Sequence, residues 1–465
     1  MLFAGCDWSD KWLDFAVQDR TGTVLAEHRI VYATSTDPVA DYLAFLTPLA
    51  RRWRATITGI EDTGILFARA LAASGMTVVH VDPTRAARHR SALGVAKSDR
   101  ADATLIATMV RTGVHRPVVA STSESQALRV VAHAHRAAVT ARTAAVHSLR
   151  AALVRIWPAA ADAWPSTVGG LRSAQARTIL AAVPGPRAAS QLTRAQLADL
   201  LRRAGRNRNV NDEAERLHLH FRRPAMLLDP CVEEAEALRI QDLVASVDHA
   251  IRRTFHLERE LTTRYGTHPF HAVTAGVPGI GSVLGAYLLA EVGDRPTERF
   301  GSGRSLAAYA GVAPITWASG STTRVSFRRA SSLHLRSILH TAAFCMAMHS
   351  PGAQDYYRRR RAVGDAHSTA LRKVARRLIL CLYHCMAAGV LYEDSVAFSY
   401  DPDRPDAPVL RRRKGPLSDT EIVQAREQLD GGEATVVGVA RMFGVSPQTI
   451  YRHVLCRPRR GSASA

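Results

Sequence analysis

Residues 55–82 read ATITGIEDTGILFARALAASGMTVVHVD, and this stretch decides the architecture of the first part of the chain. Its hydrophobic pattern predicts a strand, a helix and a second strand, over residues 55–60, 65–74 and 76–81. The last run is mostly apolar and β-branched, which is typical of a strand buried inside a parallel sheet. We therefore predict a β-α-β unit that ends at Asp82-Pro83.

Three β-prone segments precede this unit. They cover residues 2–6, 12–17 and 23–32, and Asp19-Arg20-Thr21-Gly22 is a turn between the last two. Segments that lie so close together in the chain predict a β-meander. A meander followed by a β-α-β unit predicts a mixed α/β sheet for the N-terminal domain.

Four carboxylates stand at the ends of these predicted elements. Asp7 and Glu61 each follow a predicted strand. Asp99 and Asp102 open a helix after Lys97-Ser98, and their spacing of three places both on one helical face. Strand ends and a helix start can converge on one point. Oxygen ligands gathered there would suit Mg²⁺, and a pair of such ions can act on a phosphate.

Each of these acids, taken singly, is better explained as a structural residue. Acids at helix starts commonly cap the helix or interact with its dipole. Acids after strands are often plain loop residues, and the same holds for the neighbouring Asp10, Asp14 and Asp62.

The composition indicates a nucleic-acid partner. The chain has 465 residues, which favours two or three domains, and a net charge of +20. The positive excess lies beyond about residue 110, so a polyanion explains it better than a uniformly solvated basic surface. The six cysteines lack zinc-finger spacing and fit a reducing cytoplasm. We expect no signal peptide and no membrane span, hence a bacterial cytoplasmic protein associated with the nucleoid.

Two long helices are predicted in the middle of the chain, over residues 123–156 and 232–265. The first carries an alanine-rich stripe with a repeat of roughly 3.5 residues, which is typical of a coiled coil. Its positions are Leu128, Val131, Ala134, Ala138, Ala141, Ala145, Leu149 and Ala152. These helices could pair within one chain or between protomers. Residues 158–231 between them suggest no chemistry.

Two glycines mark a candidate DNA-backbone clamp. Val277-Pro278-Gly279-Ile280-Gly281 precedes a helix, and exposed amides at a helix start can hold a phosphate. The pattern resembles a helix-hairpin-helix element, with Gly279 and Gly281 as phosphate-binding positions. A simple turn before a helix explains it equally well.

A serine next to glycine follows further on, in Ala318-Ser319-Gly320-Ser321. A hydroxyl in such a loop would be accessible, and a serine that attacks phosphate would store the bond energy in a covalent ester. Arginines can grip a phosphate and stabilise its transition state. Those that follow are Arg324, Arg328, Arg329 and Arg336. A Ser-Gly pair alone is far more often structural.

These motifs together resemble one known family. Gly5-Cys6-Asp7-Trp8, residues 59–64, Val81-Asp82-Pro83 and residues 97–103 come in the order and spacing of the RuvC-like domain of the DEDD insertion-sequence transposases. That family is also described as bridge-RNA-guided recombinases. The resemblance implies that Asp7, Glu61, Asp99 and Asp102 are the catalytic tetrad, binding two Mg²⁺ ions for which Mn²⁺ can substitute.

The C-terminal half resembles the same family. There a serine before glycine, after a Gly-x-Ala-Pro element, is the nucleophile, and this position falls on Ser319. The family's usual Ser-Ser-Gly-Gly or Ser-Gly-Lys is absent, so Ser321 is an alternative. The resemblance further implies a homo-oligomer, a dimer or tetramer, that pairs the element ends with target DNA. It also implies that a structured guide RNA directs the choice of site.

The tail contains a second DNA-binding candidate. A proline- and aspartate-rich linker with the basic run Arg411-Arg412-Arg413-Lys414 precedes three predicted short helices. This region resembles the helix-turn-helix of resolvases and DNA invertases. The side chains expected to face a major groove are Gln448, Thr449, Arg452 and His453. A small protein-docking bundle is the alternative.

The sequence thus predicts a DNA transposase with five segments. Residues 1–118 form an α/β RuvC/RNase H-like metal domain, 119–270 a helical coiled-coil region, and 271–395 a mostly α serine domain. Residues 396–416 are a basic linker and 417–465 a three-helix helix-turn-helix domain. The alternatives are a RuvC-like metal-dependent nuclease that forms no covalent intermediate and a non-catalytic helix-turn-helix regulator.

Overall fold

The computed structural model describes residues 1–398 except 50–55, 95, 97, 120, 166–168, 225 and 321. In the tail it describes residues 419–430, 436, 439, 442, 443, 445, 450 and 454, and it leaves out the side chains of Thr323, Arg324, Asp419 and Asp430. The chain divides into two compact units. The first comprises residues 1–122 and 295–301, and the second comprises residues 123–294 and 302–465.

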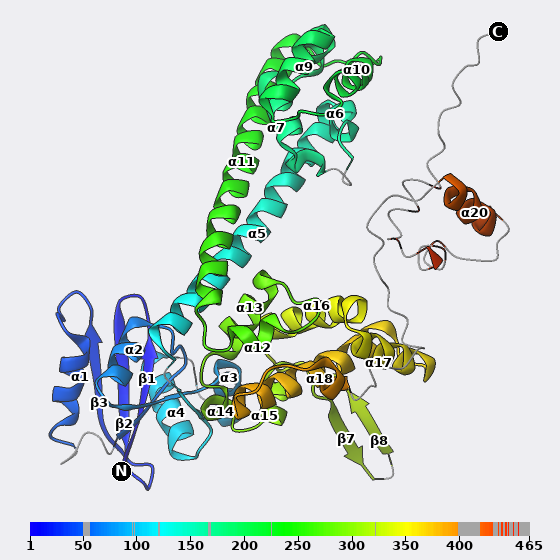
Figure 1. The fold of residues 1–465 in the computed structure, drawn as a ribbon. Coiled ribbons are helices and arrows are strands. Elements are labelled where there is room, and N and C mark those ends of the chain that lie inside the picture. The colour runs from blue at the N-terminus through cyan, green and yellow to red at the C-terminus, as the bar shows by residue number, and fades with distance from the viewer. Residues whose placement is uncertain are drawn as a thin grey trace, which may run out of the picture. The chain divides into compact units, whose positions relative to one another are not determined.

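A six-stranded mixed sheet forms the centre of the first unit (Figure 1). Its strands are β1 (Leu2–Trp8), β2 (Trp12–Gln18), β3 (Val24–Val31), β4 (Thr56–Ile60), β5 (Thr77–His80) and β6 (Arg116–Pro117). Their order across the sheet is β3-β2-β1-β4-β5-β6. β1, β4 and β5 run parallel, whereas β2, β3 and β6 pair antiparallel with their neighbours. The predicted mixed α/β sheet is confirmed.

Helices cover both faces of this sheet. The helices of the unit are α1 (Pro38–Leu46), α2 (Leu66–Ala73), α3 (Pro83–Leu93), α4 (Asp99–Arg111) and α14 (Pro296–Phe300). One face packs Cys6 and Phe15 against Tyr42 of α1 and Phe67 of α2. The alternate residues of the strands face α4. There Phe3 of β1 and Ile57 of β4 pack with apolar side chains of α4. This two-sided core follows from the period of two along a strand.

The structure changes one detail of the first strand. Asp7 was expected just past its end, but β1 continues to Trp8 and Asp7 pairs in register with Asp14 of β2. The ladder with β2 carries the strand two residues further than the apolar run alone suggests. Asp7 is therefore held by strand hydrogen bonding on the α4 face of the sheet.

Two long helices dominate the second unit, α5 (Ser123–Ile156) and α11 (Pro230–Gly266). They lie side by side and run in opposite directions (Figure 1), so the predicted long helices pair within one chain. Leu128 and Leu149 of α5 are fully buried, as predicted for the stripe. Ala141 is exposed instead, so the stripe is interrupted there.

A bundle of short helices packs at one end of this pair. It contains α6 (Pro158–Asp162), η3 (Gly170–Arg172), α7 (Ala174–Ala182), α8 (Pro186–Gln191), α9 (Arg194–Arg203) and α10 (Val210–Phe221). Trp157, Trp164 and Phe221 pack together in its core.

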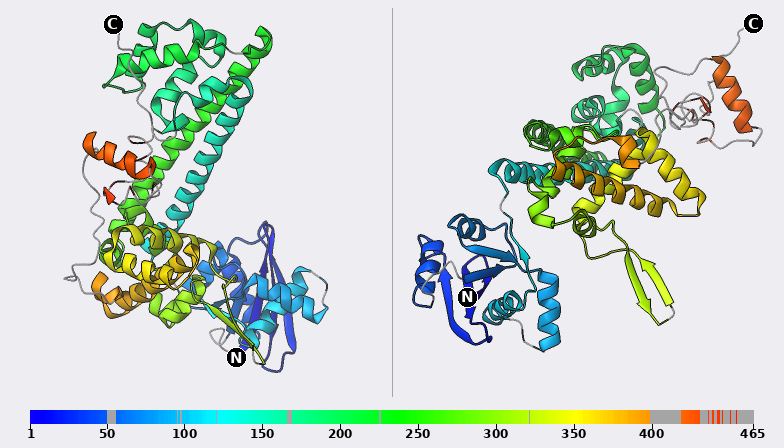
Figure 2. Two further views of the ribbon diagram at one scale, coloured as in Figure 1. Left: turned by 90° about the vertical axis from the view of Figure 1, so that its right-hand side faces the viewer. Right: turned by 60° about the horizontal axis from the view of Figure 1, so that its bottom comes forward.

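The remaining part of the unit is mostly helical. Its helices are α12 (His271–Ala275), α13 (Ser282–Val292), α15 (Gly303–Tyr309), α16 (Leu333–His349), α17 (Pro351–Ala362), α18 (His367–Ala388) and α19 (Asp394–Phe398). One antiparallel hairpin, β7 (Ile315–Ser319) and β8 (Thr322–Ser326), projects from these helices (Figure 2).

The described part of the tail contains α20 (Asp419–Asp430) and a small apolar cluster. The tail sequence predicts a small core of Val439, Ala440, Val445, Ile450 and Val454. Four of these pack there with Ala425 of α20, and Ala440 lies outside the described residues. The helix-turn-helix itself stays a prediction. None of the described helices combines the length and apolarity needed to cross a bilayer.

Candidate functional site

The four predicted carboxylates come from three neighbouring elements of the first unit. Cys6 of β1 pairs in parallel register with Ile60 of β4, so Asp7 and Glu61 are the next residues at the same end of both strands. Asp99 and Asp102 occupy the first turn of α4. Ser98 caps this helix, because its Oγ accepts a hydrogen bond from the Ala101 amide at 3.3 Å.

Two glycines let α4 approach the strands closely enough to join this group. Gly5 of β1 lies beside Gly59 of β4 in the parallel register. A Cβ at Gly5 would lie 2.0 Å from the Ala103 carbonyl oxygen, and one at Gly59 would lie 2.3 Å from Val110 Cγ2. Side chains at either position would push α4 away. The glycine pair thus brings the start of α4 to the strand ends that carry the other acids.

The other three carboxylates act electrostatically on Asp7. Its pKa is raised from 3.8 to about 7, first by burial and then by the charges of Asp102, Glu61 and Asp99, in that order. Like charges close together disfavour ionisation, and a bound cation would reverse this effect. An all-oxygen donor set with excess negative charge fits a hard divalent cation.

Arg90 of α3 supplies the positive charge nearest to one of these acids. Its Nη1 donates to Asp102 Oδ1 and Oδ2 at 2.5 and 2.6 Å, and both side chains are largely buried. The sequence did not single out Arg90, because no motif separates it from the other arginines of residues 85–90. The guanidinium shows that a cationic group fits against Asp102.

Asp99 has weaker contacts than Asp102. Trp12 Nε1 donates to its Oδ2 at 3.1 Å, and Arg29 lies 3.9 Å from the same oxygen. Nearly half of the Asp99 side chain remains exposed. It is therefore accessible to a ligand from solvent.

The neighbouring acids have other partners. Arg29 donates from Nε and Nη2 to both oxygens of Asp14, at 2.8 and 2.7 Å. Asp62 accepts a hydrogen bond from the Gly64 amide, and Asp82 caps α3 through the Thr84 and Arg85 amides. These contacts explain Asp14, Asp62 and Asp82 as structural residues.

Ser319 lies at the end of β7, where the sequence had suggested a loop. It pairs with Thr322 across the hairpin and is exposed. Gly320 follows with a φ of 55°, the left-handed conformation that the tight connection requires. The alternative, Ser321, lies outside the described residues. A strand end holds the Ser319 backbone more firmly than a free loop would.

The four arginines predicted to bind phosphate lie in different surroundings. Arg329 is exposed and Arg328 is partly buried, with its Nε lacking a hydrogen-bond partner among the described residues. The side chain of Arg324 lies outside the described residues. Arg336 lies in the first turns of α16 and contacts the face of Phe327, 5.0 Å from the ring centroid.

A second arginine, which the sequence did not single out, completes a basic cavity around Phe327. Arg372 of α18 lies 4.5 Å from the centroid of the same ring. With Arg336, His340 and Thr341, it lines a cavity of about 350 Å³, and none of the described residues that line this cavity is acidic. Burial and the charge of Arg336 lower the pKa of Arg372, which marks two like charges held together. Such a pair suits a phosphate or a stacked base.

The glycines of the expected phosphate clamp have different surroundings. Gly279 has a φ of 84°, and a Cβ there would lie 2.8 Å from the Cys345 carbonyl oxygen of α16. Gly281 is exposed at the start of α13. Packing against α16 therefore explains Gly279, and phosphate binding at either glycine stays a prediction. The tail positions Gln448, Thr449, Arg452 and His453 lie outside the described residues.

Comparison with known proteins relates both halves of the chain to one group. A family model described as "Transposase" matches residues 4–158, and one described as "Transposase IS116/IS110/IS902 family" matches residues 272–358. The "Mini-circle putative transposase for IS117" of Streptomyces coelicolor is 36% identical over 406 residues, covering 86% of this chain and 97% of the relative.

Two further relatives match shorter stretches. The "Insertion element IS110 uncharacterized 43.6 kDa protein" of Streptomyces coelicolor is 34% identical over 31% of this chain and 35% of its own length. The "Insertion element IS116 uncharacterized 44.8 kDa protein" of Streptomyces clavuligerus is 33% identical over 27% of this chain and 31% of its own length.

Proposed function

Because the chain belongs to the IS116/IS110/IS902 family of insertion-sequence transposases, which recombine DNA, we propose that it exchanges strands through a metal-bound carboxylate tetrad and a serine nucleophile. The observation that carries this proposal is the placement of Asp7 and Glu61 at the same end of two neighbouring strands, with Asp99 and Asp102 in the first turn of α4 and close enough to raise the pKa of Asp7. The match to the IS117 relative covers 86% of this chain, so it includes both Asp99 and Asp102 of the first unit and Ser319 of the second, and this supports one strand-exchange activity that uses both units.

Asp7, Glu61, Asp99 and Asp102 would hold two Mg²⁺ ions, or Mn²⁺ in their place. Two such ions, when bound, stabilise the attacking and leaving oxygens of a phosphate displacement. Arg90 donates to both oxygens of Asp102, so the guanidinium would have to move aside for Asp102 to bind a cation.

The covalent step belongs to Ser319. Its Oγ would attack the scissile phosphorus and lose its proton, while the bond from phosphorus to the deoxyribose oxygen breaks and that oxygen takes up a proton. The phosphoserine ester keeps the energy of the broken bond. A hydroxyl from the second DNA would then attack the ester, rejoin the strand and restore Ser319. Arg324, Arg328, Arg329 and Arg336 follow Ser319 in the sequence and would bind the phosphates of the DNA near it.

The test is a search for a denaturant-resistant protein–DNA adduct. Purified protein is incubated with Mg²⁺, labelled DNA spanning the joined ends of the element, and RNA transcribed from its flanks. We expect an adduct that is lost in Ser319→Ala and in Asp7→Asn but kept in Ser321→Ala. An adduct lost only in Ser321→Ala would transfer the role to that serine. Cut DNA without any adduct would instead indicate a metal-dependent nuclease in which water attacks.

The same proposal includes a structured guide RNA and a homo-oligomer, a dimer or tetramer. The net charge of +20 supports binding of RNA as of any polyanion. RNA that copurifies with the protein and maps beside the element would support guidance. The molar mass of the complex in solution, measured by light scattering, tests the oligomer.

For the tail we propose DNA binding through Gln448, Thr449, Arg452 and His453. The apolar cluster around Ala425 and Ile450 gives this region a core of its own. Changing the four residues to alanine should weaken binding to the element ends and leave adduct chemistry at saturating protein intact. Unchanged DNA affinity would favour a docking role for the tail.

A further inference from the structure

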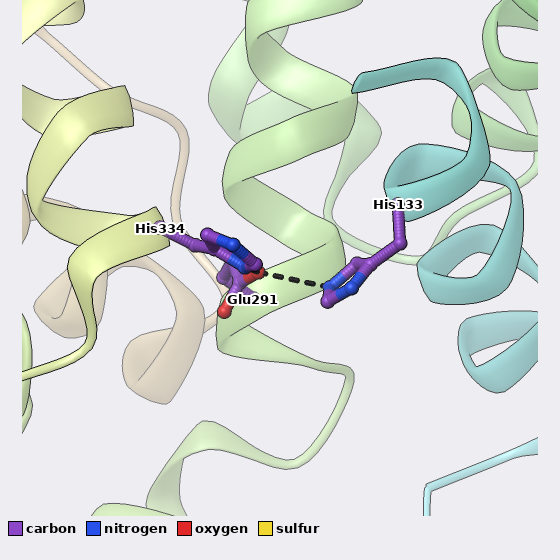
Figure 3. A group of neighbouring side chains, drawn as sticks. All are labelled: His133, Glu291 and His334. Carbon is purple, nitrogen blue, oxygen red and sulfur yellow. Dashed lines mark hydrogen bonds and ion pairs between the residues drawn. The ribbon is translucent and has the colours of Figure 1, made fainter. Parts of the chain in front are cut away.

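Three side chains from three helices of the second unit point toward one another (Figure 3). They are His133 of α5, Glu291 of α13 and His334 of α16. His133 Nε2 lies 3.1 Å from Glu291 Oε1, and His334 Nδ1 lies 3.4 Å from the same oxygen. The two imidazole rings meet edge to face, with their centroids 5.1 Å apart. No motif or spacing connects these residues in the sequence.

The three side chains differ in how far they are exposed to solvent. The Glu291 side chain is only 5% exposed, whereas those of His133 and His334 are 40% and 52% exposed. The carboxylate is thus fixed inside the protein, and both imidazoles reach solvent. A small ion could enter from the histidine side without moving a helix.

Positive charge surrounds Glu291. Burial raises the pKa of this carboxyl, but the hydrogen bond from His133 and the charges of Arg129, His133 and His334 lower it further than burial raises it. Arg129 adds a positive charge to the surroundings, which opposes a cation, and this cost must be met by direct bonds to the ligand atoms.

The distances match the ligands of a small transition-metal ion. Bonds of about 2.0–2.1 Å place neighbouring ligand atoms roughly 3.3 Å apart in a tetrahedron. The distances from Glu291 to His133 and to His334 bracket this value, and all three ligand atoms lie within 4.8 Å of one another. Two imidazoles and one carboxylate select Zn²⁺ and its neighbours, whereas Mg²⁺ prefers oxygen ligands.

We propose that His133, Glu291 and His334 form a binding site for one Zn²⁺-like divalent ion, separate from the carboxylate tetrad. The ion would be bound by His133 Nε2, a Glu291 oxygen and His334 Nδ1, with water completing the tetrahedron. In the metal-bound form His133 carries its proton on Nδ1, because Nε2 gives its lone pair to the metal.

The position of the site suggests what the ion does. It would join the long helix α5 to α13 and to the first turn of α16. Arg336 lies two residues after His334 in that turn, and α16 follows the hairpin that carries Ser319. The ion would therefore fix the helix that presents Arg336 to the basic cavity. Its role is positional and requires no redox chemistry.

The experiment measures Zn²⁺ binding by the full-length protein after treatment with a chelator. Elemental analysis gives the ion bound per chain, and Co²⁺ serves as a spectroscopic probe, because tetrahedral Co²⁺ absorbs visible light far more strongly than octahedral Co²⁺. Every measurement is repeated in the Asp7→Asn, Asp102→Asn double variant, which weakens the tetrad. The site variants are His334→Gln and Glu291→Gln, and the matched control is His147→Gln, an exposed histidine on α5.

We expect one tightly bound Zn²⁺ in the wild type, the tetrad variant and His147→Gln. In His334→Gln and Glu291→Gln the affinity should fall by more than about 100-fold, since even outer partners of a metal ligand contribute about 10- to 100-fold. Equal Zn²⁺ affinity in His334→Gln and the wild type, or no retained Zn²⁺ in any protein, would overturn the proposal. The group would then be a hydrogen-bonded carboxylate only. His334 is half exposed, so its variant should fold, and thermal melting without metal checks this.

Discussion

At the scale of single residues, Asp7 shows the cost of grouping like charges. It is partly buried, and the charges of three other carboxylates act on it, so its pKa is raised. Arg90 offsets part of this cost through both oxygens of Asp102. Bound cations would offset the repulsion between these acids, as the proposed function requires.

The raised pKa of Asp7 predicts how stability depends on pH. The folded state binds a proton up to about pH 7, whereas the unfolded chain releases it near 3.8, so metal-free stability should fall as pH rises between these values. The linkage amounts to at most about 4 kcal/mol, and solvent screening of a partly exposed carboxylate reduces it.

Asp7→Asn should remove this dependence and raise the melting temperature at pH 8 in the presence of chelator. Thermal unfolding at pH 5 and pH 8 measures it, with the exposed Asp10→Asn as the control. An Asp7→Asn protein that melts like the wild type at pH 8 would show that Asp7 is not under repulsion.

Arg90→Gln should have opposite effects with and without metal. Without metal it leaves Asp102 unpaired, so the melting temperature should fall. With Mn²⁺ or Mg²⁺ the stabilisation should be larger than in the wild type, because the ion no longer competes with a guanidinium and binding stabilises in proportion to the logarithm of affinity. Thermal melts across a metal titration measure both. A smaller metal-induced shift in Arg90→Gln would mean that Arg90 assists the ion.

At the scale of elements, the site depends on how closely α4 lies against β1 and β4. The glycines at positions 5 and 59 are adjacent across the parallel ladder and leave room for the backbone of α4. The hairpin β7–β8 likewise fixes the position of Ser319, because this residue lies at the end of a hydrogen-bonded strand. In both places the backbone geometry determines where the side chains are presented.

Gly5→Ala should separate α4 from the sheet, because its Cβ would meet backbone atoms of α4 at Ala103 and Ala107. Overpacking of this kind typically costs about 1–3 kcal/mol. Metal-induced stabilisation should shrink as well, since Asp99 and Asp102 move with the helix. Gly64→Ala is the control, as only the flexible Asp62 side chain lies near it. Chemical unfolding and metal titration of both variants measure the effect; equal losses in both would contradict the close-packing argument.

At the scale of the whole molecule, a net charge of +20 dominates the interaction with nucleic acid. Binding of this kind releases counterions and weakens steeply with salt. The cavity around Phe327 concentrates two of these charges, because among the described residues no carboxylate pairs with Arg336 or Arg372. Affinity for DNA or RNA should therefore come from many sites, of which this cavity is one.

Arg372→Ala should weaken nucleic-acid binding by an amount that depends on salt. If Arg372 contacts a phosphate, the slope of log affinity against log salt should become smaller by about one. Filter binding between low and moderate salt measures the slope, with Arg359→Ala as the control, since Arg359 pairs with Asp355. An unchanged slope in Arg372→Ala would place the cavity away from the nucleic acid.

The sequence by itself determined the mixed sheet, the helix at 123–156 and the family motifs, because strand and helix periodicities and short motifs are written in neighbouring residues. It did not predict the hairpin β7–β8, and the metal-binding role of the four acids stays a prediction. Only the tertiary structure decided which distant side chains meet. Arg90 on Asp102, Arg372 beside Phe327 and the contact of His133, Glu291 and His334 each join residues from different elements. Such pairs depend on how helices and strands pack, and packing distances are not encoded in any local pattern.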